Sequence, residues 1–268
     1  MLIYKATETV NFAQGDLMML GAFFAFTASV ALGWPYWATI LFALGVMAVV
    51  GMLVERIVLR PVLGYPQFTV VMITIGVGYV MRGIVTMVPG WGTDTYQIRT
   101  PFADEVWKFG GLVVPVQQFA VIVMTMALCA VLYLFFSRTR LGIAMQATSQ
   151  NQLAAYYMGI PVKLIFSLIW AISAGVATAA GILLAPVTLI DINMGLAVAL
   201  KAFAAAVLGG FGSIPGALVG GLTIGLIELY SGATLPEGFK DTMPYIVLLV
   251  MLWVRPQGMF GTLGRKKV

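Results

Sequence analysis

Residues 164–190 read LIFSLIWAISAGVATAAGILLAPVTLI and contain no charged side chain. A helix needs about 20 apolar residues to cross the hydrocarbon core of a bilayer, which is roughly 30 Å thick. This run meets that requirement. Other apolar runs are candidates for the same role: residues 17–32, 35–54, 68–88, 119–136, 194–208, 214–230 and 243–254, of which 194–208 and 243–254 are short. The sequence therefore predicts an all-α fold, a polytopic transmembrane helical bundle with about eight membrane segments.

The composition of the whole chain agrees with this class of protein. Hydrophobic residues make up 61% of the 268 residues and charged residues 9%. The mean hydropathy is +0.99, whereas soluble domains carry about 25% charged residues. No stretch is polar enough or long enough to fold separately in water, so we expect a single transmembrane domain over residues 1–268. Its longest loop, residues 89–118, contains turn signals typical of a small hairpin or helix.

The net charge of +5 does not indicate a nucleic-acid partner. The basic residues cluster at the ends of apolar runs, where they set membrane topology, and not along one face. If the loop at 137–163 is cytosolic, the outside segments hold only Arg99, Lys108 and Lys240. The other basic residues of the loops and termini are then cytosolic: Lys5, Arg56, Arg60, Arg138, Arg140, Lys163, Arg255, Arg265, Lys266 and Lys267. The same orientation predicts a cytosolic C-terminus.

This polar loop carries the start and stop signals of a short helix of its own. Ser149 and Gln152 have the spacing of a capping box, in which each side chain satisfies a backbone N–H of the first helical turn. Gly159 can adopt the left-handed conformation that closes a helix, and Pro161 cannot continue one. The signals predict a helix over residues 150–158, which is far too short to span a bilayer.

One face of this short helix is apolar. Leu153, Ala154, Tyr157 and Met158 fall at positions i, i+1, i+4 and i+5, which places them on one stripe. Such a stripe suits a groove on a soluble partner. It equally suits an amphipathic loop helix that lies on the lipid surface.

The sequence lacks the residues that most enzymes need. It has no histidine, the commonest general base and metal ligand. It also has no phosphate-binding loop, no nucleophile elbow, no C-x-x-C pair and no carboxylate cluster. We therefore expect no catalytic, cofactor-binding or metal-binding residues, and any ATP hydrolysis must occur on another chain.

Arg82, Lys201 and Glu228 lie within apolar runs. An ionised side chain costs roughly 2.5 to 3.5 kcal/mol at mid-depth in a membrane, so each of the three needs a partner or water. Arg82 and Glu228 lie at similar depths toward the outside, and we expect them to form an ion pair. A contact with the solute pathway or a binding protein, or snorkelling to the surface, remains an alternative for both. Lys201 can reach the surface by snorkelling.

Polar residues precede the first apolar run. Asn11, Gln14 and Asp16 either line a solute pathway or cap the helix expected to begin at residue 17. For Asp16 the cap is the simpler expectation. Further along the chain, the glycines and the proline of residues 209–216 predict a tightly turned or broken helix pair. The small-xxx-small spacings at 216–220 and 221–225 predict close helix packing.

Three segments resemble a known family. Residues 10–16 (VNFAQGD), 74–79 (TIGVGY) and 200–221 (LKAFAAAVLGGFGSIPGALVGG) are similar to the permease subunits of branched-chain amino acid ABC transporters, which are binding-protein-dependent importers. The similarity covers nearly the whole chain. The family ordinarily has another transmembrane helix before the Asn-Phe-Ala motif, so we expect a helix upstream of Met1.

The loop helix also resembles a family motif. Ala154, Ala155 and Gly159 match the Ala-Ala-x-x-x-Gly pattern by which importer permeases grip their ATPases, although Leu153 stands where that pattern often has Glu and the closing Leu-Pro is absent. The resemblance implies a cytosolic coupling helix. Its ATPase-docking residues are Leu153, Ala154, Ala155, Tyr157, Met158 and Gly159.

The resemblance implies a transport subunit and not an enzyme. Its expected partners are a second homologous permease subunit, two cytosolic ATPase subunits and a periplasmic or tethered substrate-binding protein, all at the bacterial cytoplasmic (inner) membrane. It would move branched-chain or related amino acids, with the choice of solute made by the binding protein. Two rival classes are an ATP-independent secondary transporter or channel for small polar solutes, and a structural membrane scaffold. The first would need titratable residues along a central path.

Overall fold

The computed structural model describes residues 3, 10–62, 64–92, 94–98, 100–103, 105–109, 112–210, 213–236, 238–255 and 257–260. The chain divides into two compact units: Ala6–Leu196, and Met1–Lys5 together with Ala197–Val268. Most of the described residues are helical, because a backbone in lipid can satisfy its polar groups only within a helix or a closed barrel.

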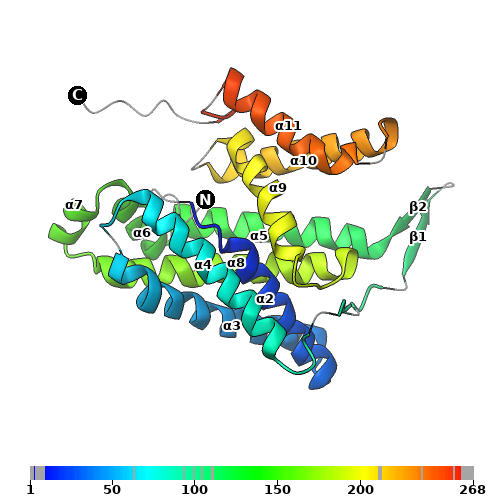
Figure 1. Cartoon of the computed structure of the whole chain (residues 1–268), viewed down its shortest axis with the longest axis horizontal. Helices are drawn as coiled ribbons and strands as arrows, with labels where there is room; N and C mark the ends of the chain where they lie inside the picture. Colours follow the sequence, from blue (N-terminus) through cyan, green and yellow to red (C-terminus); the bar gives the residue numbers. More distant parts are fainter. Residues whose placement is uncertain are drawn as a thin grey trace. The chain divides into compact units, whose positions relative to one another are not determined.

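The first unit begins with α2 (Gln14–Phe26), which continues through a π-helical turn, Thr27–Ala31. Helix α3 (Tyr36–Val54) continues through a second π-helical turn, Glu55–Leu59, and a 3₁₀ turn, Arg60–Val62. The other elements of this unit are α4 (Gln67–Met87), β1 (Val106–Phe109), β2 (Leu112–Pro115), α5 (Val116–Arg138), α6 (Arg140–Gln150), α7 (Gln152–Tyr157) and α8 (Val162–Thr188). Helix α9 (Met194–Gly209) leads into the second unit, which contains α10 (Ile214–Thr234) and α11 (Phe239–Val254) (Figure 1).

Each of the predicted apolar runs is helical, but the described part of the chain does not confirm eight membrane segments. Six helices there are long and apolar enough to cross a membrane: Gln14–Ala31, Tyr36–Val62, Gln67–Met87, Val116–Arg138, Val162–Thr188 and Pro215–Thr234. Helices α9 and α11 have 16 residues each, fewer than the roughly 20 that a full crossing requires. These two correspond to the runs that were short in the sequence.

The long loop between α4 and α5 contains a small hairpin, one of the two elements expected there, and it is the exception to an all-α fold among the described residues. Strands β1 and β2 are antiparallel, with Val106 opposite Pro115 and Trp107 opposite Val114. The loop is also tied to the end of α8, because Tyr96 and Ile190 exchange backbone hydrogen bonds of 2.9 and 2.8 Å.

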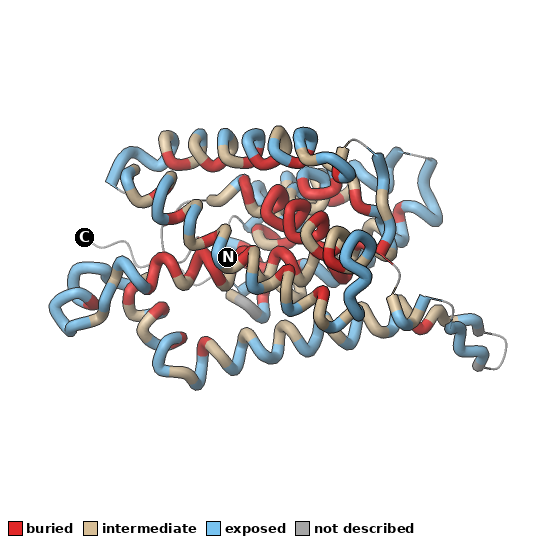
Figure 2. The backbone as a smooth tube through the Cα atoms, turned by 90° about the horizontal axis from the view of Figure 1, so that it is seen from below, coloured by how far each residue is buried: buried red, intermediate tan, exposed pale blue. Residues whose placement is uncertain are grey.

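Helix α8 is the centre of the first unit and packs against α2 and α3 (Figure 1). In the apolar window of α8, 61% of the residues are buried, whereas in that of α5 only 6% are. Figure 2 shows this contrast as helices that are red along much of their length and others that alternate blue and tan. Helix α5 therefore presents most of its surface outside this chain.

Glycine allows α8 to approach its neighbours at backbone distance. A Cβ atom added to Gly51 of α3 would lie 2.6 Å from the carbonyl oxygen of Trp170. A Cβ atom added to Gly181 would lie 2.6 Å from the carbonyl oxygen of Met18 in α2. Helices in lipid gain little from hydrophobic exclusion, so small residues that permit such contact supply much of their attraction.

In the second unit the predicted tightly turned helix pair is confirmed. Helix α9 ends at Gly209 and α10 begins after Ser213, whose hydroxyl accepts a 3.1 Å hydrogen bond from the Gly216 N–H. Residues 211 and 212 of this turn lie outside the described residues. Gly216 and Gly220 face the backbone of α9, whereas Gly221 and Gly225 have open space before them. Only the first small-xxx-small spacing therefore packs within the described part of this chain.

The contact at Gly51 leads to a first prediction. Gly51→Ala should lower the free energy of unfolding by about 1–3 kcal/mol, because the new methyl group meets backbone that cannot rotate away. The measurement is the thermal unfolding midpoint of the purified protein in detergent. Gly45→Ala is the matched control on the same helix, where no atom lies within 4 Å of the added methyl group. An equal midpoint for the two variants would contradict the close contact between α3 and α8.

Candidate functional site

Helix α7 exposes the apolar stripe that the sequence predicted. Leu153, Tyr157 and Met158 are 64%, 76% and 83% exposed, and Ala154 is exposed beside them. Clustered apolar side chains on an exposed face suit contact either with a partner protein or with the lipid surface. The stripe is therefore the first candidate for a functional contact.

The predicted start of this helix is wrong. Ser149 lies in the last turn of α6, and its hydroxyl donates a 2.9 Å hydrogen bond to the Gln146 carbonyl oxygen. Asn151 is extended, and its side-chain oxygen accepts a 3.0 Å hydrogen bond from the Ala154 N–H. Asparagine is among the strongest N-cap residues, so Asn151 was the signal that the capping-box interpretation missed.

The predicted end of the helix is confirmed. Gly159 has a φ of 81°, a left-handed conformation that glycine adopts without strain. The Ile160 N–H then donates a 3.0 Å hydrogen bond back to the Ala155 carbonyl oxygen. Of the six predicted docking residues, five lie on the surface, but Ala155 is only 4% exposed. Ala155 therefore seats α7 on its own chain and does not belong to the exposed face.

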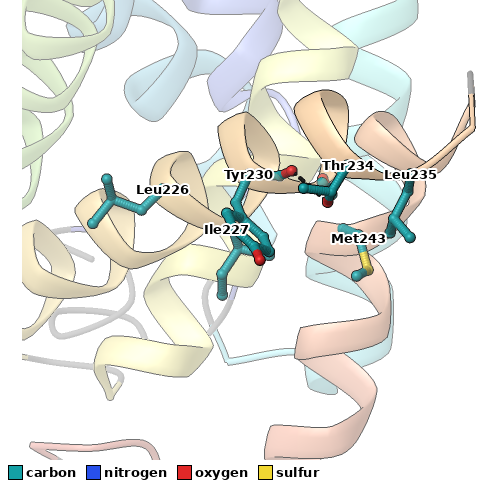
Figure 3. Close-up of a pocket in the computed structure, with 7 residues that line it drawn as sticks. Leu226, Ile227, Tyr230, Thr234, Leu235 and Met243 are labelled. Atoms are coloured by element: carbon teal, nitrogen blue, oxygen red, sulfur yellow. Dashed lines mark hydrogen bonds between the residues drawn. The ribbon is translucent and has the colours of Figure 1, made fainter.

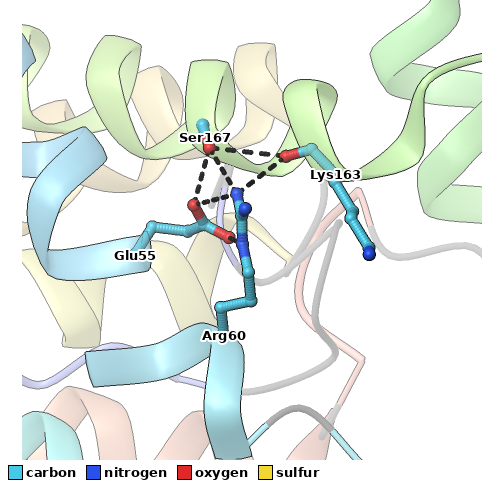
Figure 4. A network of polar contacts seen from close by, with 4 residues as sticks. All are labelled: Glu55, Arg60, Lys163 and Ser167. Carbon is cyan, nitrogen blue, oxygen red and sulfur yellow. Dashed lines mark hydrogen bonds and ion pairs between the residues drawn. The ribbon is translucent and has the colours of Figure 1, made fainter. Parts of the chain in front are cut away.

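A polar cluster lies where α8 begins, a few residues after α7. It consists of Glu55, Arg60, Ser167 and the carbonyl group of Lys163, and we call it the Glu55 cluster (Figure 4). Arg60 donates from Nε and Nη2 to the two carboxylate oxygens of Glu55, at 3.0 and 2.8 Å. Its Nη2 also contacts the Lys163 carbonyl oxygen at 3.2 Å and Ser167 Oγ at 2.8 Å. Ser167 Oγ donates a 2.6 Å hydrogen bond to Glu55 Oε2.

The Glu55 carboxylate is fully buried, at 1% exposure, and no sequence motif marks it as a functional residue. It follows directly after an apolar run, where a carboxylate is typical of a loop. Its three charge-assisted hydrogen bonds replace the water that burial removes.

A second ion pair joins α2 to α4. Arg82 Nε donates to Asp16 Oδ1 at 2.6 Å, and the Asp16 side chain is 5% exposed. Asp16 lies in the first turn of α2 but makes no capping hydrogen bond, so its expected role as a cap is wrong. Its second oxygen lies against Gly78, where a Cβ atom would collide with it. Gly78 therefore makes room for the pair.

The third cluster corrects the expected pairing of Arg82 with Glu228. Glu228 pairs with Lys201, whose Nζ lies 2.7 Å from Glu228 Oε1 and 3.0 Å from Asp241 Oδ1. Lys201 is therefore held by two carboxylates and does not simply snorkel. The cluster joins α9, α10 and α11, whereas Arg82 already has Asp16 as its partner.

Asn11 and Gln14 form a polar chain between the start of α2 and α8. Asn11 Nδ2 donates to Gln14 Oε1 at 3.3 Å, and Ser173 Oγ donates to the same oxygen at 3.1 Å. Gln14 Nε2 donates a 3.0 Å hydrogen bond to the Ser173 carbonyl oxygen. Asn11 Oδ1 accepts from the Ala13 N–H at 3.0 Å, which makes Asn11 a local turn residue as well.

A pocket of about 310 Å³ lies along α10 and α11 of the second unit (Figure 3). Its lining residues are Leu226, Ile227, Tyr230, Ser231, Thr234, Leu235 and Met243. None of them is charged, so the pocket offers no ionic anchor for an amino-acid zwitterion. Within the described ranges, no three acidic or cysteine side chains gather in a way that could hold a metal ion.

The helices of membrane length in the described part of the chain define a polytopic membrane protein. A family model described as the permease component of the branched-chain amino acid transport system matches residues 1–252. The chain belongs to this family.

Several relatives carry the same description in their names. The high-affinity branched-chain amino acid transport system permease protein BraD of Pseudomonas aeruginosa is 30% identical over 278 residues, which cover 100% of this chain and 91% of the relative. LivH of Escherichia coli K12 is 30% identical over 282 residues, covering 100% and 90%. LivH of Salmonella typhimurium is 29% identical over 282 residues, with the same coverage. No solved structure matches the chain.

The cap at Asn151 leads to a second prediction. Asn151→Ala should destabilise α7 by about 1 kcal/mol, because the first turn loses the acceptor of the Ala154 N–H. Hydrogen exchange of the α7 amides should become faster in this variant. Ser149→Ala is the control, since the Ser149 hydroxyl bonds to a carbonyl group of α6. A larger increase in α7 hydrogen exchange for Ser149→Ala than for Asn151→Ala would contradict the Asn151 cap and favour the capping box at Ser149.

The pairing of Arg82 leads to a third prediction. Arg82→Met should lower the free energy of unfolding by about 3–5 kcal/mol, because Asp16 remains buried without its cation. Adding Asp16→Asn should recover most of that loss, which thermal denaturation in detergent would measure. The loss of unfolding free energy caused by Glu228→Gln should instead be additive with the loss caused by Arg82→Met. A coupling energy between Arg82 and Glu228 larger than that between Arg82 and Asp16 would refute the ion pair of α2 and α4.

Proposed function

We propose that this chain is a transmembrane permease subunit of an ATP-driven importer that moves branched-chain or related amino acids across the cytoplasmic membrane. The observation that carries the proposal is the exposed apolar face of α7 on a chain of the branched-chain permease family. The relatives are named for high-affinity branched-chain amino acid transport. The sequence has no phosphate-binding loop, so ATP would be hydrolysed by separate subunits.

The proposed assembly contains two related permease subunits, two cytosolic ATPase subunits and a periplasmic or tethered substrate-binding protein. The basic residues at the ends of the apolar runs favour an orientation with α7 and the C-terminus in the cytosol. Helix α7 would then face the ATPases as a coupling helix. The exposed surface of α5 is available to lipid or to the second permease subunit.

Leu153, Tyr157 and Met158 would insert into a groove of the ATPase, an arrangement in which an amphipathic helix supplies apolar anchors. Ala155 would hold α7 to the permease from below, since it is buried there. Closure of the ATPases on ATP would displace α7 and the helices joined to it, and the pathway would open alternately to each side.

We place the solute pathway beside Asn11 and Gln14. They form part of a chain of uncharged polar groups between α2 and α8, and polar groups inside a membrane protein commonly mark the path of the solute. A zwitterionic solute needs such groups to replace its water as it crosses.

The docking surface leads to a fourth prediction. Tyr157→Glu should weaken the binding of the ATPase subunits by at least about thirtyfold, or roughly 2 kcal/mol, because an aromatic anchor is replaced by a charge. The measurement is the amount of ATPase that co-purifies with the permease, together with uptake in proteoliposomes. Tyr156→Glu is the matched control, since Tyr156 is also exposed but lies outside the stripe.

Two results would contradict the proposed function. Full retention of the ATPases by Tyr157→Glu, Leu153→Glu and Met158→Glu would exclude docking through α7. Rapid solute uptake by the permease without ATPase subunits or nucleotide would assign the chain to ATP-independent transporters or channels.

A further inference from the structure

We propose that the Glu55 cluster is the joint through which a displacement of α7 reaches α3, and that Glu55, Arg60 and Ser167 are positioning residues for transport. The inference rests on the proposed function, because it requires that the ATPases move α7. It concerns residues that contact neither the ATPases nor the solute in that proposal.

The cluster lies where the segment carrying α7 enters the bundle. Helix α7 ends at Tyr157 and α8 begins at Val162, so only a few residues separate the exposed stripe from the first turn of α8. Arg60 and Glu55 hold the first two turns of α8, through the Lys163 carbonyl oxygen and the Ser167 hydroxyl. A movement of α7 therefore acts directly on these two turns.

The other side of the cluster is formed by the end of α3. Glu55 and Arg60 lie five residues apart, and in an α-helix such residues point about 140° away from each other. The intervening π-helical turn, Glu55–Leu59, has more residues per turn than an α-helix, so the side chains of Glu55 and Arg60 lie on the same side of the helix. Single π-helical turns within α-helices occur frequently at functional sites.

Contacts outside the cluster also hold α3 against α8. The two helices already meet at backbone distance one turn earlier, at Gly51 and Trp170. A buried ion pair is often no more stabilising than apolar residues of the same volume. A guanidinium group bonded to both carboxylate oxygens does, however, fix direction and register in a way that apolar contacts do not. We therefore assign to the cluster the transmission of movement from α8 to α3, and not the stabilisation of their packing.

The experiment uses the complete transporter in proteoliposomes and measures the solute taken up per ATP hydrolysed. Ser167→Ala and Arg60→Lys should leave the ATPases bound and hydrolysing, but should lower this ratio by at least about fivefold, the smallest effect typical of an allosteric coupling. Arg60→Lys keeps the positive charge beside the buried carboxylate and loses the bidentate geometry. It therefore protects the test against simple unfolding, which the melting temperature of each variant would reveal.

Thr188→Ala is the matched control, because it removes a hydroxyl from the same helix that bonds to the Leu184 and Leu189 carbonyl oxygens, far from the cluster in sequence. Its uptake per ATP should equal that of the unmodified transporter. An unchanged ratio in Ser167→Ala and Arg60→Lys would overturn the joint while leaving α7 docking intact. If the ATPase subunits failed to bind the unmodified permease, the proposed function itself would be overturned.

A distance measurement separates transmission from stability. In a Cys129→Ala background, spin labels at Tyr156→Cys on α7 and Leu53→Cys on α3 occupy exposed positions. If the cluster is a rigid joint, ATP binding should leave the distance between the labels unchanged in the otherwise unmodified complex and should shift it when Ser167→Ala is added. If ATP binding changed the distance between the labels equally with and without Ser167→Ala, or changed it in neither, the proposal would be overturned.

Discussion

The close approach of α8 to α2 and α3 is the constraint on which the first unit depends. Hydrophobic exclusion does little to bring helices together in lipid, so contact between backbones must supply the attraction. Gly51 and Gly181 provide that contact, each at a point where a Cβ atom would collide with a backbone carbonyl group of the neighbouring helix, and Gly21 makes room for the Thr178 side chain. Once these surfaces meet, the depth of every polar group on the three helices is fixed. The Glu55 cluster and the Gln14–Ser173 hydrogen bonds can form only because this register is held.

The ion pairs of the described helices follow one rule, which is that the carboxylates of Asp16, Glu55, Glu228 and Asp241 each have a cation within the same compact unit. Asp16 is held by Arg82, Glu55 by Arg60 and Glu228 by Lys201. An unpaired ion would be several kcal/mol less stable in such surroundings, so the pairs that join two helices, Asp16–Arg82 and Lys201–Glu228, constrain the rotation of those helices. The pairs therefore fix orientation about the helix axes, while the glycine contacts fix distance.

The sequence predicted the helices well, because an apolar run in lipid has almost no alternative to a helix and because Gly159 and Pro161 end α7 by local geometry. It predicted the ion pairs poorly. The depth of a residue in the membrane can be estimated by counting along its apolar run, and similar depths suggested that Arg82 pairs with Glu228. The direction in which a side chain points around the helix axis depends on helix packing, which such counting cannot predict. The cap of α7 failed for a related reason: Ser149 and Asn151 both suit an N-cap, and the extension of α6 through Gln150 decided between them. The π-helical turn that aligns Glu55 with Arg60 has no sequence signal at all.

These constraints together determine how a force on α7 can spread. A helix of six residues has little stability of its own, and it is fixed at its start by Asn151 and from below by Ala155. If the ATPases displace α7 as proposed, these two anchors would pass the displacement to α6 and α8. Helix α8 in turn cannot slide past α2 or α3 without breaking the backbone contacts at Gly51 and Gly181. Under the proposal, the displacement would be directed to the end of α8 nearest α7, where the hydrogen bonds of the Glu55 cluster connect α8 rigidly with the end of α3.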